Sequence, residues 1–85
     1  MKIAVEISMY PLTEDYENEV LAFIEELKTH PIHRQTNGMS TQVFGEYEVV
    51  MNAVNQSIKS VYSKGKKAVF NMKVLNNPLP EDFSI

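Results

Sequence analysis

The stretch Met39–Val54, MSTQVFGEYEVVMNAV, decides the fold, because it begins as a predicted strand and continues as a predicted helix. Strand side chains alternate between two faces, which places Thr41 and Val43 on one face and Ser40, Gln42 and Phe44 on the other. Gly45 is expected to end the strand. After it, apolar residues recur at three- and four-residue spacing, which indicates one buried helical stripe: Tyr47, Val50, Met51, Val54, Ile58 and Val61.

Length and composition limit the class of protein. The 85 residues suffice for one hydrophobic core, and we expect a single domain at residues 1–75 and a C-terminal tail at residues 76–85. A formal net charge of −3 argues against nucleic acid as a partner, because phosphate contacts need a basic patch. The absence of cysteine excludes disulfides and thiolate chemistry. No apolar run approaches the roughly 20 residues that span a bilayer, so no membrane is expected and a cytoplasmic location is the default.

The sequence before this stretch predicts a strand followed by a helix. Residues 2–10 alternate apolar and polar, as in a strand that is buried on one face, and Pro11 is expected to end it. Thr13 is the expected N-cap of a helix whose apolar stripe contains Val20, Phe23, Ile24 and Leu27. Pro31 stops this helix.

The remaining elements complete a βαββαβ order. Residues 32–36 are a short strand candidate, and Asn37-Gly38 predicts a tight hairpin turn because both positions tolerate positive φ. The second long helix is expected from about Glu46 to Ser63, with Gly65 as a left-handed C-cap. Residues 67–75 alternate again as a last strand.

This order predicts an α+β ferredoxin-like fold, in which a four-stranded antiparallel sheet carries two helices on one face. The other face would carry a mixture of polar and apolar side chains: Glu6, Ser8, Tyr10, Gln42, Phe44, Val69, Asn71 and Lys73. Such a mixture is too apolar to stay fully hydrated, so we expect sheet-face or edge pairing with another copy of the chain.

A polar group near the middle of the sheet is the remaining chemical candidate: Ser8, Ser40, Thr41 and Asn71, with Tyr10 near by. His30 and His33 are too few for a metal site, and no nucleophile elbow surrounds Ser40. One interpretation is that the polar group satisfies backbone groups or an oligomer contact. The other interpretation is a ligand pocket. The hydroxyl of Thr41 needs a hydrogen-bond partner on the helix-facing side, and a bound ligand would supply it.

At these residues the sequence resembles the small thiamine-binding proteins of the YkoF-like type. Two blocks carry the likeness: ISMYPLTEDY at residues 7–16, and the opening stretch with Ser40, Thr41 and Gly45. A weaker match is Val69-Phe70-Asn71. The likeness extends over nearly the whole chain except the tail, and Phe44 departs from it, since several relatives have a charged residue there.

The resemblance implies a ferredoxin-like fold, homo-oligomers (dimers or tetramers) built through the sheets, and binding of thiamine or its hydroxymethylpyrimidine half. It implies neither catalysis nor a cofactor. Transferred residue by residue, it makes Ser40 and Thr41 contacts of the pyrimidine, Ser8, Tyr10 and Asn71 further contacts, and Met39 a packing surface for the ring. The alternative is a structural or regulatory homo-oligomer without a small-molecule ligand. A weaker alternative is a small enzyme that uses Glu6 on the open sheet face.

Overall fold

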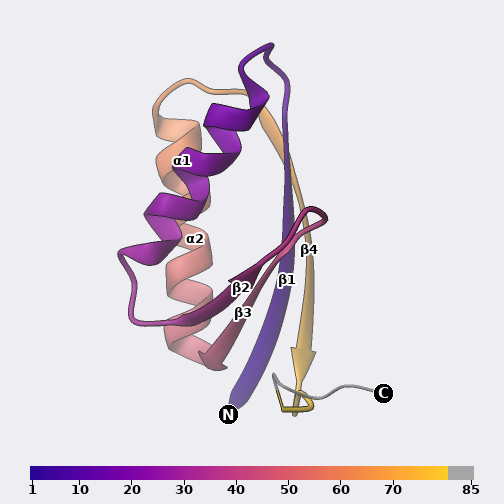
Figure 1. Cartoon of the computed structure of the whole chain (residues 1–85). Helices are drawn as coiled ribbons and strands as arrows, with labels where there is room; N and C mark the ends of the chain where they lie inside the picture. The colour runs from indigo at the N-terminus through magenta and orange to yellow at the C-terminus, as the bar shows by residue number, and fades with distance from the viewer. Residues whose placement is uncertain (81–85) are drawn as a thin grey trace.

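Two helices cover one face of a four-stranded sheet in the computed structural model, which describes residues 1–80 (Figure 1). The elements are β1 (Lys2–Pro11), α1 (Tyr16–Lys28), β2 (His33–Thr36), β3 (Thr41–Glu46), α2 (Tyr47–Ser63) and β4 (Ala68–Asn76). The strand order is β2-β3-β1-β4, and every neighbouring pair is antiparallel. The predicted ferredoxin-like fold is therefore confirmed. Residues 81–85 of the predicted tail lie outside the described residues.

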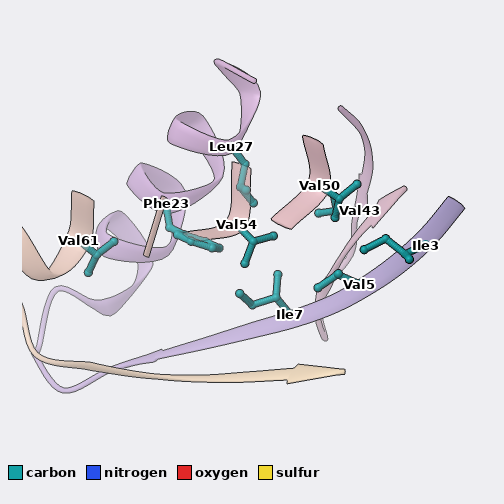
Figure 2. Packing of buried hydrophobic residues seen from close by; sticks show 9 residues of the cluster. All are labelled: Ile3, Val5, Ile7, Phe23, Leu27, Val43, Val50, Val54 and Val61. Atoms are coloured by element: carbon teal, nitrogen blue, oxygen red, sulfur yellow. The ribbon is translucent and has the colours of Figure 1, made fainter. Parts of the chain in front are cut away.

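The core lies between β1, β3 and the two helices. Alternate residues of β1 (Ile3, Val5 and Ile7) point at the helix layer (Figure 2) and are at most 1% exposed. They meet Phe23 and Leu27 of α1, Val50, Val54 and Val61 of α2, and Val43 of β3. Full burial of such aliphatic side chains contributes about 1.5–3 kcal/mol each, so this cluster is the main source of stability.

Gly45 does not end the strand, as expected from the sequence, but lies inside β3 opposite Ile3. The strand continues to Glu46, and α2 begins at the next residue. Gly45 has φ +151°, a backbone conformation that L side chains rarely adopt. A Cβ atom at this position would lie 3.3 Å from Cγ2 of Val50. Glycine thus lets the chain turn directly from strand into helix while α2 packs closely on the strand.

The expected start of α1 is wrong. The cap residue of α1 is Asp15 and not Thr13, and its side chain accepts a hydrogen bond from Nδ2 of Asn18 (2.8 Å) in place of a backbone N–H. Strand β1 ends at Pro11 as expected, although this proline still pairs with Ala68. Proline is tolerated there because its missing N–H would point away from β4, toward an edge that no strand of the described residues occupies at this level. The left-handed conformation predicted for Gly65 is confirmed by its φ of +74°, one residue after the C-cap Lys64.

The β2–β3 hairpin has a four-residue loop instead of the expected two-residue turn. Thr36 pairs with Thr41, and neither Asn37 nor Gly38 has positive φ. The side-chain Oδ1 of Asn37 accepts hydrogen bonds from the backbone N–H groups of Met39 (2.8 Å) and Ser40 (3.1 Å). Asparagine therefore shapes the loop through its side chain. Ser40 and Met39, expected at the start of a strand, belong to this loop.

Strand β4 forms one edge of the sheet and is mostly exposed. The helices pack mainly on β1 and β3, so the helix-facing side chains Met72 and Val74 extend beyond this cover and are 37% and 48% exposed. Met72 is therefore not a core residue, although it pairs with the fully buried Ile7 of β1. Phe70, nearer the start of the strand, does pack against the core.

Substitution of Gly45 by alanine should destabilise the fold. The added Cβ meets Val50 and forces an unfavourable φ, a combination that costs about 1–3 kcal/mol. Urea unfolding followed by circular dichroism measures the change. Gly38→Ala is the matched control, because nothing lies within 4 Å of its Cβ position and its effect should stay within about 0.5 kcal/mol. Equal effects of the two substitutions would contradict this account of the strand-to-helix joint.

Candidate functional site

A cleft of about 670 Å³ lies beside the C-terminal half of β1, between α1 and the β2–β3 loop. Residues 7–11 of β1 and residues 36–41 of the hairpin line it, together with the N-terminal half of α1. The helix contributes Tyr16, Glu17, Val20, Leu21, Phe23 and Ile24. The volume falls in the range of about 300–1,000 Å³ that is usual for small-molecule sites.

Two threonine hydroxyls meet in the wall of this cleft. Oγ1 of Thr36 lies 3.0 Å from Oγ1 of Thr41, and either can be the donor. Thr41 is 5% exposed and stands on the helix-facing side next to Ile7, its partner in the ladder. Because one hydroxyl proton is used in the pair, the other remains able to donate, and both oxygens keep lone pairs. The pair can therefore offer both a donor and an acceptor to a bound molecule.

The remaining walls are largely apolar and aromatic. Phe23 packs on Phe70 with ring centroids 4.9 Å apart, which fixes its position on the core side of the cleft. Tyr10 and Tyr16 are 53% and 55% exposed, and the exposed side chain of Glu17 also lines the cleft. Apolar walls, a few hydroxyls and one carboxylate suit a flat, partly polar organic molecule.

Ser8 and Ser40 line the cleft but direct their hydroxyls into contacts with the protein. Oγ of Ser8 donates to the backbone carbonyl of Met39 (3.3 Å), and Oγ of Ser40 donates to Oε2 of Glu6 (2.9 Å). Ser40 also accepts from Nε2 of Gln42 (2.9 Å). These bonds tie the loop to the open face of the sheet and hold the cleft wall in place.

Five of the six residues predicted for ligand binding are brought together at this cleft: Ser8, Tyr10, Met39, Ser40 and Thr41. Met39 is 86% exposed at the rim. Asn71 lies apart from the lining, on the open face of β4 opposite Ser8.

Sequence reasoning missed Thr36 and assigned the inner face of α1 only to the core. Thr36 could have been found from the hairpin register, since a four-residue loop places it opposite Thr41. Val20 and Ile24 were recognised as apolar stripe residues. They line the cleft because the hairpin diverges from β1 at this end and leaves space below the helix.

Residues 1–80 show neither a metal site nor a membrane-spanning helix. This range holds no group of three or more histidine, aspartate or glutamate side chains placed to bind a metal ion. Neither helix is long and apolar enough to cross a membrane. A second hollow of about 660 Å³ lies at the other end of the sheet, between Phe44 and Gly45 and the segment Pro78–Pro80, and the threonine pair does not line it.

The comparisons with known proteins agree with this architecture. Residues 5–78 match the sequence profile of a family described as thiamine-binding protein. A hypothetical protein of Methanocaldococcus jannascii is similar in structure, with a TM-score of 0.78 and 23% identity over 96% of this chain and 87% of its own. A candidate thiamine biosynthesis/salvage protein of Thermotoga maritima gives a TM-score of 0.79 and 22% identity, over 91% and 85% of the two chains.

A protein of Streptococcus pneumoniae gives a TM-score of 0.80 and 18% identity, over 100% of this chain and 93% of its own. At these identities the solved structures support the fold alone. No curated protein matches the chain in sequence.

The two cleft threonines should be energetically coupled. Thr41→Val removes one hydroxyl and leaves the other without its partner, so it should reduce the free energy of unfolding by about 1 kcal/mol. Thr36→Val should act in the same direction and more weakly, because Thr36 is more exposed. The double variant should lose less than the sum of the two single losses, as measured by urea unfolding in a double-mutant cycle. Strict additivity would mean that the hydroxyl pair contributes nothing to stability.

Proposed function

The chain belongs to the thiamine-binding protein family, and we propose that it is a non-enzymatic protein that binds thiamine or its hydroxymethylpyrimidine half in the cleft beneath α1. The observation that carries the proposal is the cleft itself, which joins a hydroxyl pair to apolar walls at the residues that the family resemblance implicates. The family is one of binding proteins, which supports a role in binding rather than in catalysis.

An aminopyrimidine ring suits the chemistry of this cleft. The ring is flat and offers an exocyclic amine and ring nitrogens, for which the hydroxyls of Thr36 and Thr41 are suitable partners. The apolar side chains of Val20 and Ile24 can cover its faces. Ser8, Tyr10, Met39, Ser40 and Thr41 are the proposed ligand contacts, and Asn71 stays a prediction from the family resemblance.

The outer part of the cleft suits the cationic thiazolium of thiamine. Tyr10 and Tyr16 are exposed aromatic rings at the rim, and such rings attract cations held over their faces. Glu17 adds a negative charge there, although an exposed charge contributes little to affinity. The neutral pyrimidine is therefore expected inside and the charged ring outside.

Self-association through the sheet is part of the proposed function. On the open face, exposed Val69 lies opposite Tyr10 and exposed Leu75 lies opposite Ala4. Between these two apolar residues lies a polar centre in which Glu6 pairs with Lys73 (3.7 Å). Strand β4 is also a long edge strand in the described part of the chain, and such edges readily pair with another strand. A homodimer or homotetramer would cover this apolar surface. A homo-oligomer without a ligand remains the rival function.

Isothermal titration of thiamine into the purified protein should show saturable binding. Thr41→Val should weaken that binding by about 1–2 kcal/mol, because a hydroxyl that bonds the ligand is lost. Thr13→Val is the matched control, since it makes the same chemical change at an exposed site outside the cleft. If neither thiamine nor hydroxymethylpyrimidine binds or raises the melting temperature at millimolar concentration, the structural homo-oligomer becomes the better interpretation.

Sedimentation analysis should give a mass of at least two chains, and Val69→Lys should lower it. A lysine at this position places a charge in the apolar part of the open face, which opposes its burial between copies. Val49→Lys provides the control, because Val49 is a 40% exposed valine on α2, away from the sheet. A monomeric wild-type protein at micromolar concentration would contradict the proposed assembly.

A further inference from the structure

The two edges of β1 are paired to different lengths. On the β4 side the ladder continues from Ile3–Asn76 to Pro11–Ala68. On the β3 side it ends at the pair Ile7–Thr41. The last residues of β1 therefore have a neighbouring strand on one side only within the described chain.

The hydrogen bonds at the ends of the sheet show which residues of β1 face each edge. The backbone N–H of Tyr47 donates to the carbonyl of Met1 (2.9 Å) on the β3 side, and the N–H of Leu12 donates to the carbonyl of Lys67 (2.9 Å) on the β4 side. Successive residues of a strand direct their backbone groups to opposite edges. Odd-numbered residues of β1 thus face β3, so the N–H and C=O of Met9 point to the side where the ladder has ended.

The β2–β3 loop does not supply the missing partner. Its Met39 carbonyl accepts the Ser8 hydroxyl, and its Met39 and Ser40 N–H groups donate to the side chain of Asn37. In residues 1–80 no strand continues the ladder opposite Met9. Met9 also lines the cleft. One backbone donor and one backbone acceptor therefore lie side by side at the cleft wall.

We propose that the backbone N–H and C=O of Met9 form the edge that recognises the aminopyrimidine, an inference that rests on the proposed function. The amine of this ring and the adjacent ring nitrogen are a donor next to an acceptor. In a β-ladder one residue exchanges two hydrogen bonds with the residue opposite, and the ring can take the place of that missing residue. The Thr36–Thr41 pair lies at the next position along the same edge and provides the further contact.

This mode of binding distinguishes between ligands of the same shape by the order of their hydrogen-bond donor and acceptor. The 4-oxo analogue of thiamine carries a carbonyl in place of the amine and an N–H in place of the ring nitrogen. It has nearly the same shape, but it would set donor against donor and acceptor against acceptor at Met9. Unpaired polar groups at a binding site reduce affinity strongly, so the wild-type protein should bind this analogue at least about 10-fold more weakly than thiamine.

A proline at position 9 tests the backbone donor directly. Met9→Pro removes the N–H that points into the cleft but leaves the β4 ladder intact, because that ladder uses the even-numbered residues. Met9→Ala loses the same side chain and keeps the N–H, so it is the matched reference. Thiamine should bind the proline variant at least about 10-fold more weakly than the alanine variant, as measured by titration calorimetry after circular dichroism has verified that both are folded.

Two results would overturn the inference while leaving the proposed function in place. One is equal binding of thiamine and its 4-oxo analogue to the wild-type protein, an experiment that needs no variant to fold. The other is equal affinity of the proline and alanine variants for thiamine. Failure of the wild-type protein to bind thiamine at all would instead remove the proposed function, and this inference with it.

Discussion

The pairing of β1 with β3 is the constraint on which the rest of this structure depends. It joins Lys2 to Glu46 at one end and Ile7 to Thr41 at the other, and it fixes which side chains of both strands face the helices. A shift by one residue would turn Ile3, Val5 and Ile7 toward the open face, so burial of these three side chains holds the register. The same register determines where the ladder stops.

The cleft is a consequence of that stop. Beyond Ile7 the central strand continues along β4, whereas the hairpin leaves it through a loop held by the Asn37 side chain. Helix α1, which begins only at Tyr16, lies over the resulting space. Hydroxyls, aromatic rings and the backbone edge of β1 thereby meet at one place. A cleft has formed here because β3 and β4 stop pairing with β1 at different residues, Ile7 on one side and Pro11 on the other.

The open face of the sheet, unlike the helix-covered face, carries both charged and apolar side chains. Its centre holds a network in which Glu6 accepts from Ser40 and pairs with Lys73, while exposed apolar side chains of β4 lie around it. Ser40 belongs to the loop that lines the cleft, so the loop connects the two faces. If another copy of the chain covers this face, the bond between Glu6 and Ser40 links assembly to the shape of the site.

The sequence by itself determined the order of the elements, the helix-facing sides of β1, β3 and β4, and the position of the ferredoxin-like core. These features follow from local periodicity, which is visible in residues such as Ile3, Val5 and Ile7. The loop length of the hairpin, the start of α1 and the end of β3 at Gly45 were predicted wrongly, because side-chain hydrogen bonds and contacts between distant elements decide them. The candidate site likewise has a part that the sequence predicted and a part that only the tertiary structure reveals. Thr41 could be chosen from its polar side chain on a buried face, but its partner Thr36, the wall formed by α1 and the free edge of Met9 depend on the level at which β3 leaves β1. Only the tertiary structure sets that level, because it results from packing between segments far apart in the chain.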